Sequence, residues 1–168
     1  MSTQGTIAQN MTTQVLSQQS SAVRVFTALL RAHAAATRRL NAQLVADHGL
    51  TISDYEVLLR LARAPDRRMK RVELAEQVLL TASGVTRLLD GLERAGFVER
   101  GSCATDRRVV YAVLTGAGLQ KLRSASKSHV AQIDDLFAER LEVEELDTAA
   151  QVLEKLADTA GLVCDPDG

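Results

Sequence analysis

The chain has 168 residues, of which 46% are hydrophobic and 24% charged, a composition typical of a globular protein with one core. No apolar run approaches the ~20 residues that span a bilayer, and the first residues lack the basic-then-apolar order of a signal peptide, so we expect a cytoplasmic protein. Cys103, Cys164 and the three histidines are too scattered for a disulfide framework or a metal site, so we expect no metal and no cofactor.

The net charge of −1 conceals a segregation of charge along the chain. Residues 60 to 123 hold 13 of the 20 basic and 7 of the 21 acidic residues, a net +6, which leaves −7 for the remainder. An uneven solvated surface is the ordinary explanation of such a pattern. A basic segment carried on an acidic body favours instead a face that binds a polyanion.

The first predicted helix is long and follows a polar extension, residues 1–20, to which we assign no structure. From about Ser21 to His48 mainly apolar side chains recur at spacings of three and four, and Gly49 gives a stop. The positions of this seam are Phe26, Leu30, His33, Thr37, Leu40 and Leu44. The pattern predicts an amphipathic helix with a narrow apolar stripe.

A second helix is predicted from Ser53 to Pro65. Ser53 and Glu56 have the spacing of a capping box, in which two side chains satisfy backbone amides at the start of a helix. After Pro65 the sequence DRRMKR predicts a basic turn. Its cations are candidates for phosphate contacts: Arg67, Arg68, Lys70 and Arg71.

Two further helices are predicted close together, over residues 72 to 79 and from Thr81, a plausible N-cap, to about Ala95 before Gly96. The second turns apolar side chains inward and leaves small hydroxyls and charged side chains outward. The outward positions are Ser83, Thr86, Arg87 and Asp90. Such a pair is typical of a helix-turn-helix, whose second helix enters the major groove of DNA.

A hairpin follows directly, with strands over Phe97 to Gly101 and Val109 to Leu114. Its tip carries Asp106, Arg107 and Arg108, and we expect the carboxylate of Asp106 to orient Arg108 toward a minor groove. An ordinary surface turn is the alternative. A helix-turn-helix followed by a hairpin is a winged helix.

The stretches ELAEQ, SGVTRLLDGLERAGFVER and TDRRVVYAVLTGAG resemble the core of the MarR (multiple antibiotic resistance regulator) family of winged-helix transcription factors. The resemblance implies that Thr81 to Ala95 is the recognition helix, and it places an Asp-x-Arg wing signature on Asp106 and Arg108. The predicted DNA-binding residues are Thr81, Ser83, Thr86, Arg87, Asp106, Arg107 and Arg108.

Two C-terminal helices carry apolar positions beyond what a small winged helix can cover, which predicts pairing with a second copy, although a monomeric bundle is the alternative. The expected fold class is mainly α, a winged helix-turn-helix with long N- and C-terminal dimerisation helices. The expected division is residues 21–50 and 117–168 for dimerisation and 51–116 for binding double-stranded DNA at a near-palindromic operator.

Regulation is implied chiefly by the resemblance, in which a small aromatic anion binds between the dimerisation helices and the winged helix. His33 on the first seam is a candidate ligand contact, although a core role is the simpler interpretation. Cys103 lies near several arginines in the sequence, which lower a thiol pKa, so redox sensing is an alternative. The expected function is a ligand-responsive repressor.

Other classes of function find less support. The sequence has no phosphate loop, no nucleophile elbow and no metal-ligand spacing, so we do not expect an enzyme. A winged helix that binds protein rather than DNA is the main competitor. It predicts a folded dimer without salt-dependent binding to any duplex.

Overall fold

The computed structural model describes residues 20–78, 82–102 and 109–159, and it divides into two compact units, Met1–Arg39 and Leu40–Gly168. The first unit contributes the beginning of helix α2 (Ser21–His48), whose start is capped by the Ser20 hydroxyl, 3.3 Å from the Val23 amide. The prediction of a long first helix is confirmed. Its last turns belong to the second unit, where Leu40 and Leu44 are buried.

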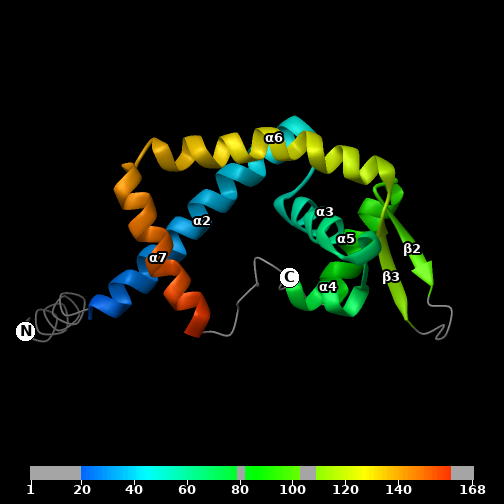
Figure 1. Ribbon diagram of the computed structural model, residues 1–168, viewed down its shortest axis with the longest axis horizontal. Coiled ribbons are helices and arrows are strands. Elements are labelled where there is room, and N and C mark those ends of the chain that lie inside the picture. The colour runs from blue at the N-terminus through cyan, green and yellow to red at the C-terminus, as the bar shows by residue number, and fades with distance from the viewer. Residues whose placement is uncertain (1–19, 79–81, 103–108, 160–168) are drawn as a thin grey trace, which may run out of the picture. The chain divides into compact units, whose positions relative to one another are not determined.

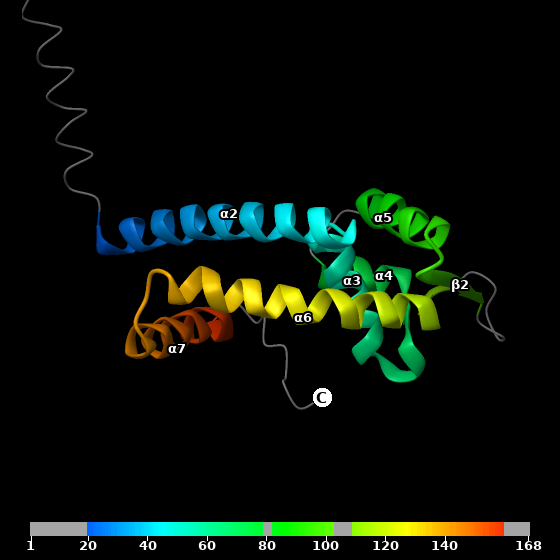
Figure 2. The same ribbon diagram turned by 90° about the horizontal axis from the view of Figure 1, so that it is seen from above.

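The second unit combines helices with one small sheet (Figure 1). Its further elements are α3 (Ile52–Arg63), the short 3-10 helix η1 (Pro65–Arg67), β1 (Arg68–Lys70), α4 (Arg71–Gln77), α5 (Ala82–Arg94), β2 (Val98–Ser102), β3 (Val110–Leu114), α6 (Gly116–Ala138) and α7 (Val143–Thr159). Figure 2 shows α3 beside the middle of α6, and α3 and α6 are in contact. None of the helices in the described part of the chain is long and apolar enough to cross a membrane.

The start of α3 differs from the prediction. Its capping box is formed by Thr51 and Asp54, not by Ser53 and Glu56: the Thr51 hydroxyl accepts from the Asp54 amide at 3.1 Å, and the Asp54 carboxylate accepts from the Thr51 amide at 2.9 Å. Glu56 is engaged elsewhere, since Arg60 donates to it at 2.7 Å. Ser53 therefore lies inside the helix.

The sheet has the antiparallel order β1-β3-β2, and its β2–β3 hairpin confirms the predicted strands to within about a residue at each end. The basic turn predicted at DRRMKR is wrong in part, because Arg68–Lys70 pair with Val113–Tyr111 as a third strand. The half-buried Met69 side chain packs against the core. Two exposed cations flank that one inward residue, so alternation over three residues was too short to reveal a strand.

One hydrophobic core joins the end of α2, helices α3 to α6 and the sheet. The fully buried large side chains are Leu44, Leu50, Val57, Leu58, Leu61, Leu74 and Leu89.

Thr115 caps α6 by accepting from the Gly118 amide at 3.0 Å, and its hydroxyl donates to the Gly96 carbonyl at 2.7 Å. A Cβ on Gly118 would collide with the Phe97 carbonyl oxygen, so this close approach of α6 to the turn before β2 requires glycine.

Candidate nucleic-acid interface

Helices α4 and α5 form the predicted helix-turn-helix. Leu74 and Val78 at the α4 side and Val85, Leu89 and Leu92 on α5 are buried in the shared core, which fixes the outward face of α5 by helical spacing. The turn between the helices, with the expected N-cap and DNA contact Thr81, lies outside the described residues.

The outward face of α5 carries the predicted base-reading side chains. Ser83, Thr86 and Arg87 are all exposed, at spacings of three and four that place them along one side of the helix. Their exposure agrees with the sequence-based expectation. Their contact with DNA remains a prediction.

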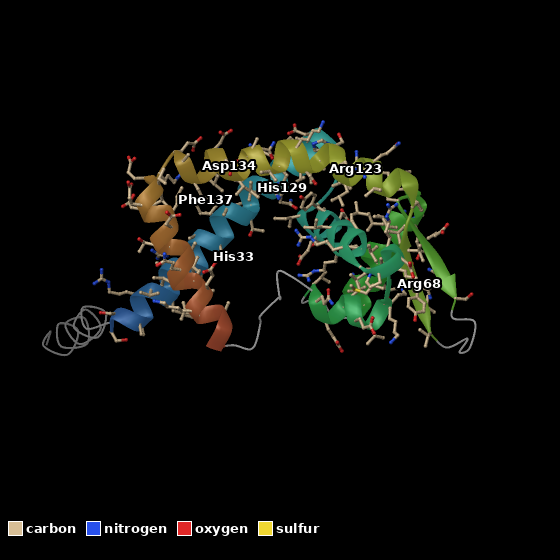
Figure 3. The ribbon with its side chains drawn as sticks, in the orientation of Figure 1. His33, Arg68, Arg123, His129, Asp134 and Phe137 are labelled. Atoms are coloured by element: carbon tan, nitrogen blue, oxygen red, sulfur yellow. The ribbon has the colours of Figure 1, made fainter. Side chains whose placement is uncertain are left out.

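The predicted phosphate contacts fall into two groups. Arg67, Arg68 and Lys70 are exposed, and the Arg68 guanidinium lies 4.0 Å from the centre of the Tyr111 ring, which steadies it beside the sheet (Figure 3). Lys70 forms an ion pair with Glu73 at 2.8 Å, and this hydrogen bond lowers the pKa of Glu73.

Arg71 is placed differently from the other three. Its side chain is 20% exposed, and its Nη2 atom lies 3.8 Å from the Asp90 carboxylate without a hydrogen-bond partner among the described residues. Arg71 therefore faces α5 rather than open solvent. Its role as a phosphate contact remains a prediction.

The tip of the wing is not described. It comprises residues 103–108, which include Cys103, Asp106, Arg107 and Arg108. The brace of Arg108 by Asp106 and redox sensing by Cys103 therefore remain predictions. The strands that carry this tip are placed, because β2 and β3 pair from Val98 and Leu114 to Ser102 and Val110.

The base of the wing carries a cluster that sequence reasoning missed. The Nε atom of Arg100 on β2 donates to Glu93 at 2.8 Å, and its Nη2 atom donates to Asp90 at 2.9 Å. The hydrogen bond to Glu93 is the main reason that the pKa of Arg100 is raised. The sequence signal was present in two acidic residues three apart on α5, but only the fold shows which cation meets them.

A second polar region lies between α3 and α6. His129 is 5% exposed, its ring centre lies 4.7 Å from that of Tyr55, and burial lowers its pKa. The Tyr55 hydroxyl is 3.2 Å from the Ser126 hydroxyl, and His48 is 2.7 Å from Ser128. These contacts connect α3 and the end of α2 to the middle of α6.

The ligand candidate His33 is exposed on α2, with Nε2 3.5 Å from the Thr37 hydroxyl (Figure 3). Within the first unit the His33 side chain is not part of a buried core, and a core role between two copies remains a prediction. A ligand role for His33 is untested. In the described part of the chain, no three His, Cys, Asp or Glu side chains form a group that could hold a metal ion.

A helix-turn-helix followed at once by a hairpin, with β1 completing a three-stranded sheet, defines a winged helix-turn-helix protein. A family model described as "MarR family" matches residues 48–109. AbsC, a MarR family transcriptional regulator from Streptomyces coelicolor, is 30% identical, with 84% of this chain and 96% of that chain covered and a TM-score of 0.69. The chain belongs to the MarR family of transcriptional regulators.

Two further relatives extend the comparison. Sco3205, a MarR family transcriptional regulator from Streptomyces coelicolor solved in complex with DNA, is 27% identical, with a TM-score of 0.75 over 84% of this chain and 89% of that chain. The HTH-type transcriptional regulator MhqR of Bacillus subtilis (strain 168) is 27% identical over 134 residues, 80% of this chain and 90% of the relative. Both similarities reach well beyond the helix-turn-helix.

Proposed function

We propose that this regulator binds double-stranded DNA sequence-specifically, with α5 in the major groove and the wing over a flanking minor groove. The observation that carries the proposal is the exposed face of Ser83, Thr86 and Arg87, in a fold that matches a relative solved in complex with DNA. A groove about 12 Å wide admits one helix with short or forked outward side chains. These three residues meet that requirement.

Affinity in this proposal comes largely from phosphates. Arg67, Arg68 and Lys70 at the start of the sheet and α4, with Arg107 in the wing, supply the cations. Each neutralised phosphate contributes a log-log slope of about −0.9 in salt. Binding is therefore expected to weaken steeply as salt rises.

The regulator acts as a homodimer on a near-palindromic operator. Support comes from apolar side chains that each unit leaves exposed: Phe26 and Leu30 on α2 are 61% and 53% exposed, and Leu153 and Leu156 on α7 are 47% and 48% exposed. Surface of this kind in a soluble helix is typical of an interface. Two-fold symmetry then places two copies of α5 at half-sites about 34 Å apart or a multiple of that distance.

The same proposal covers regulation. The protein is a cytoplasmic repressor that acts by binding and not by catalysis, and a small aromatic anion changes its DNA affinity by preferring one spacing of the two recognition helices. His33 is a candidate contact for that anion. Oxidation of Cys103 is the alternative signal.

Selection of bound sequences from random duplex DNA tests the proposal. The expected result is a near-palindrome whose half-site centres are one helical turn or a small multiple apart, bound with a steep salt dependence. A folded dimer that enriches no sequence and binds no duplex in a salt-dependent way would overturn it. That outcome would favour the protein-binding alternative.

A further inference from the structure

The face of α5 that points outward is not uniformly suited to DNA. Asp90 follows Arg87 by three residues and Thr86 by four, so its carboxylate lies on the same side of the helix, one turn further along. The side chain of Asp90 is 43% exposed, and Glu93 lies three residues beyond it. Two carboxylates on a helix that approaches phosphates would repel them.

Arg100 on strand β2 of the wing forms ion pairs with both carboxylates. Two of the N–H donors of its guanidinium are used. Nε donates to the Glu93 carboxylate at 2.8 Å, and Nη2 donates to the Asp90 carboxylate at 2.9 Å. The Arg71 guanidinium, at 3.8 Å from Asp90, is too distant for a hydrogen bond. Arg94 lines a surface pocket together with Asp90, Glu93 and Arg100, and its Nε donates to the backbone carbonyl of Asp90 and not to its carboxylate.

We propose that Arg100 is a positioning residue for DNA recognition, which neutralises Asp90 and Glu93 and holds strand β2 against α5 so that the helix and the wing meet one duplex together. This inference rests on the proposed DNA binding. It assigns Arg100 no contact with DNA, because the guanidinium is held by the two carboxylates on α5. Arg100 affects DNA binding only through its effect on the charge and position of α5.

A second feature supports a fixed geometry. Lysine has a single ammonium group, whereas arginine holds two carboxylates at once through a planar fork. The two carboxylates are three residues apart on a helix, and Arg100 lies across from them on a strand whose pairing with β3 is continuous from Val98 to Ser102. The cluster therefore restrains the helix and the strand relative to each other.

The test measures affinity for the duplex recovered by selection, at fixed salt, in two backgrounds of the full chain. In the parent, Arg100→Ala is expected to weaken binding roughly tenfold or more, because Glu93 loses its ion pair and Asp90 keeps only the more distant Arg71 beside phosphates. In the background Asp90→Asn with Glu93→Gln, the same change is expected to alter binding by no more than about twofold. Arg100→Lys in the parent is expected to fall between Arg100→Ala and the parent.

The matched control is Arg140→Ala. Arg140 lies just past the end of α6, is 59% exposed against 57% for Arg100, and pairs with Glu139 at 2.8 Å. Its removal deletes the same charge and is expected to leave affinity within about twofold of the parent. Thermal unfolding of each variant shows whether a loss of binding is a loss of fold. If Arg100→Ala does not fold, Arg100→Lys is compared in the same two backgrounds.

The outcomes separate the two claims. An equal loss of duplex affinity in both backgrounds would mean that Arg100 contacts DNA directly. No loss of affinity in either background would mean that the cluster does not affect DNA binding. Each of these results overturns this inference and leaves the proposed function intact. A parent protein that binds no duplex overturns both.

Discussion

The α5–β2 surface and the α3–α6 junction are both polar contacts between elements, but they are built from different chemistry. At the surface, charged groups pair: the exposed Arg100 with the partly exposed Asp90 and Glu93. At the junction, the ring of the buried His129 packs against the ring of Tyr55. Because exposed pairs are screened by salt and buried bases are sensitive to protons, the two regions should respond to different variables.

The largest effect is expected in the core that both regions share. Leu89→Ala removes a fully buried side chain from α5 and should lower the free energy of unfolding by about 2–5 kcal/mol. Val72→Ala on α4, where the side chain is 70% exposed, is the control and should change it by less than about 0.5 kcal/mol. Urea denaturation measures both, and equal losses would contradict the described packing of α5.

The cap of α3 is expected to have the next largest effect. Thr51→Ala removes the hydroxyl that accepts from the Asp54 amide and should cost about 1 kcal/mol of unfolding free energy. Ser53→Ala is the matched control, because Ser53 lies inside the helix, and it should cost clearly less. If urea denaturation showed a larger loss of unfolding free energy for Ser53→Ala than for Thr51→Ala, the cap would be formed by Ser53 and Glu56, as the sequence suggested.

Acid should destabilise the α3–α6 junction. Burial lowers the pKa of His129 below its ordinary 6.5, so the unfolded chain takes up a proton first as the pH falls. The stabilising contribution is therefore present above about pH 6.5 and declines as the pH drops toward the folded pKa. Unfolding free energies at pH 7.5 and 5.5 should differ more in the parent than in His129→Leu.

Exposed His33 gives the control for that comparison. His33→Leu removes an imidazole that is exposed on α2 and lies outside the α3–α6 junction, and its pH dependence is measured beside that of His129→Leu. A parent-like pH dependence in His129→Leu would show that the buried imidazole is not its source.

The smallest effect on stability is expected at the ionic surface. Arg100→Ala should lower the melting temperature slightly at low salt, and the difference from the parent should become smaller at 1 M salt, where a Debye length of about 3 Å weakens interactions between exposed charges. A difference that is as large at 1 M salt as at low salt would mean that Arg100 stabilises the fold by packing rather than by charge.

The same contrast explains what the sequence could reveal. Long helices and the hairpin follow from periodicity, and α5 was located within about a residue by Val85, Leu89 and Leu92. Strand β1 was missed because Arg68–Lys70 becomes a strand only by pairing with distant residues of β3. Local periodicity carries no record of such a partner.

The capping box of α3 and the cluster around Arg100 were not predicted from the sequence, for related reasons. Thr51 with Asp54 and Ser53 with Glu56 are overlapping patterns of similar local merit. The helix that forms starts at Ile52, whose amide donates to Asn41 of α2 at 3.0 Å, a contact that the capping pattern does not contain. The exposed face of Ser83, Thr86 and Arg87 was predictable because it is local to one helix. The role of Arg100 required the fold.

The central claim is that the outward face of α5 reads DNA, and the affinity of Arg87→Ala for the selected duplex tests it most directly. Arg87 is exposed on that face, and a base contact is worth about 1–3 kcal/mol, so binding should weaken roughly 5- to 150-fold and base preference should relax within each half-site. Arg140→Ala, the same loss of charge at the end of α6, should bind as the parent does. Unchanged affinity and base preference in a folded Arg87→Ala variant would contradict the account.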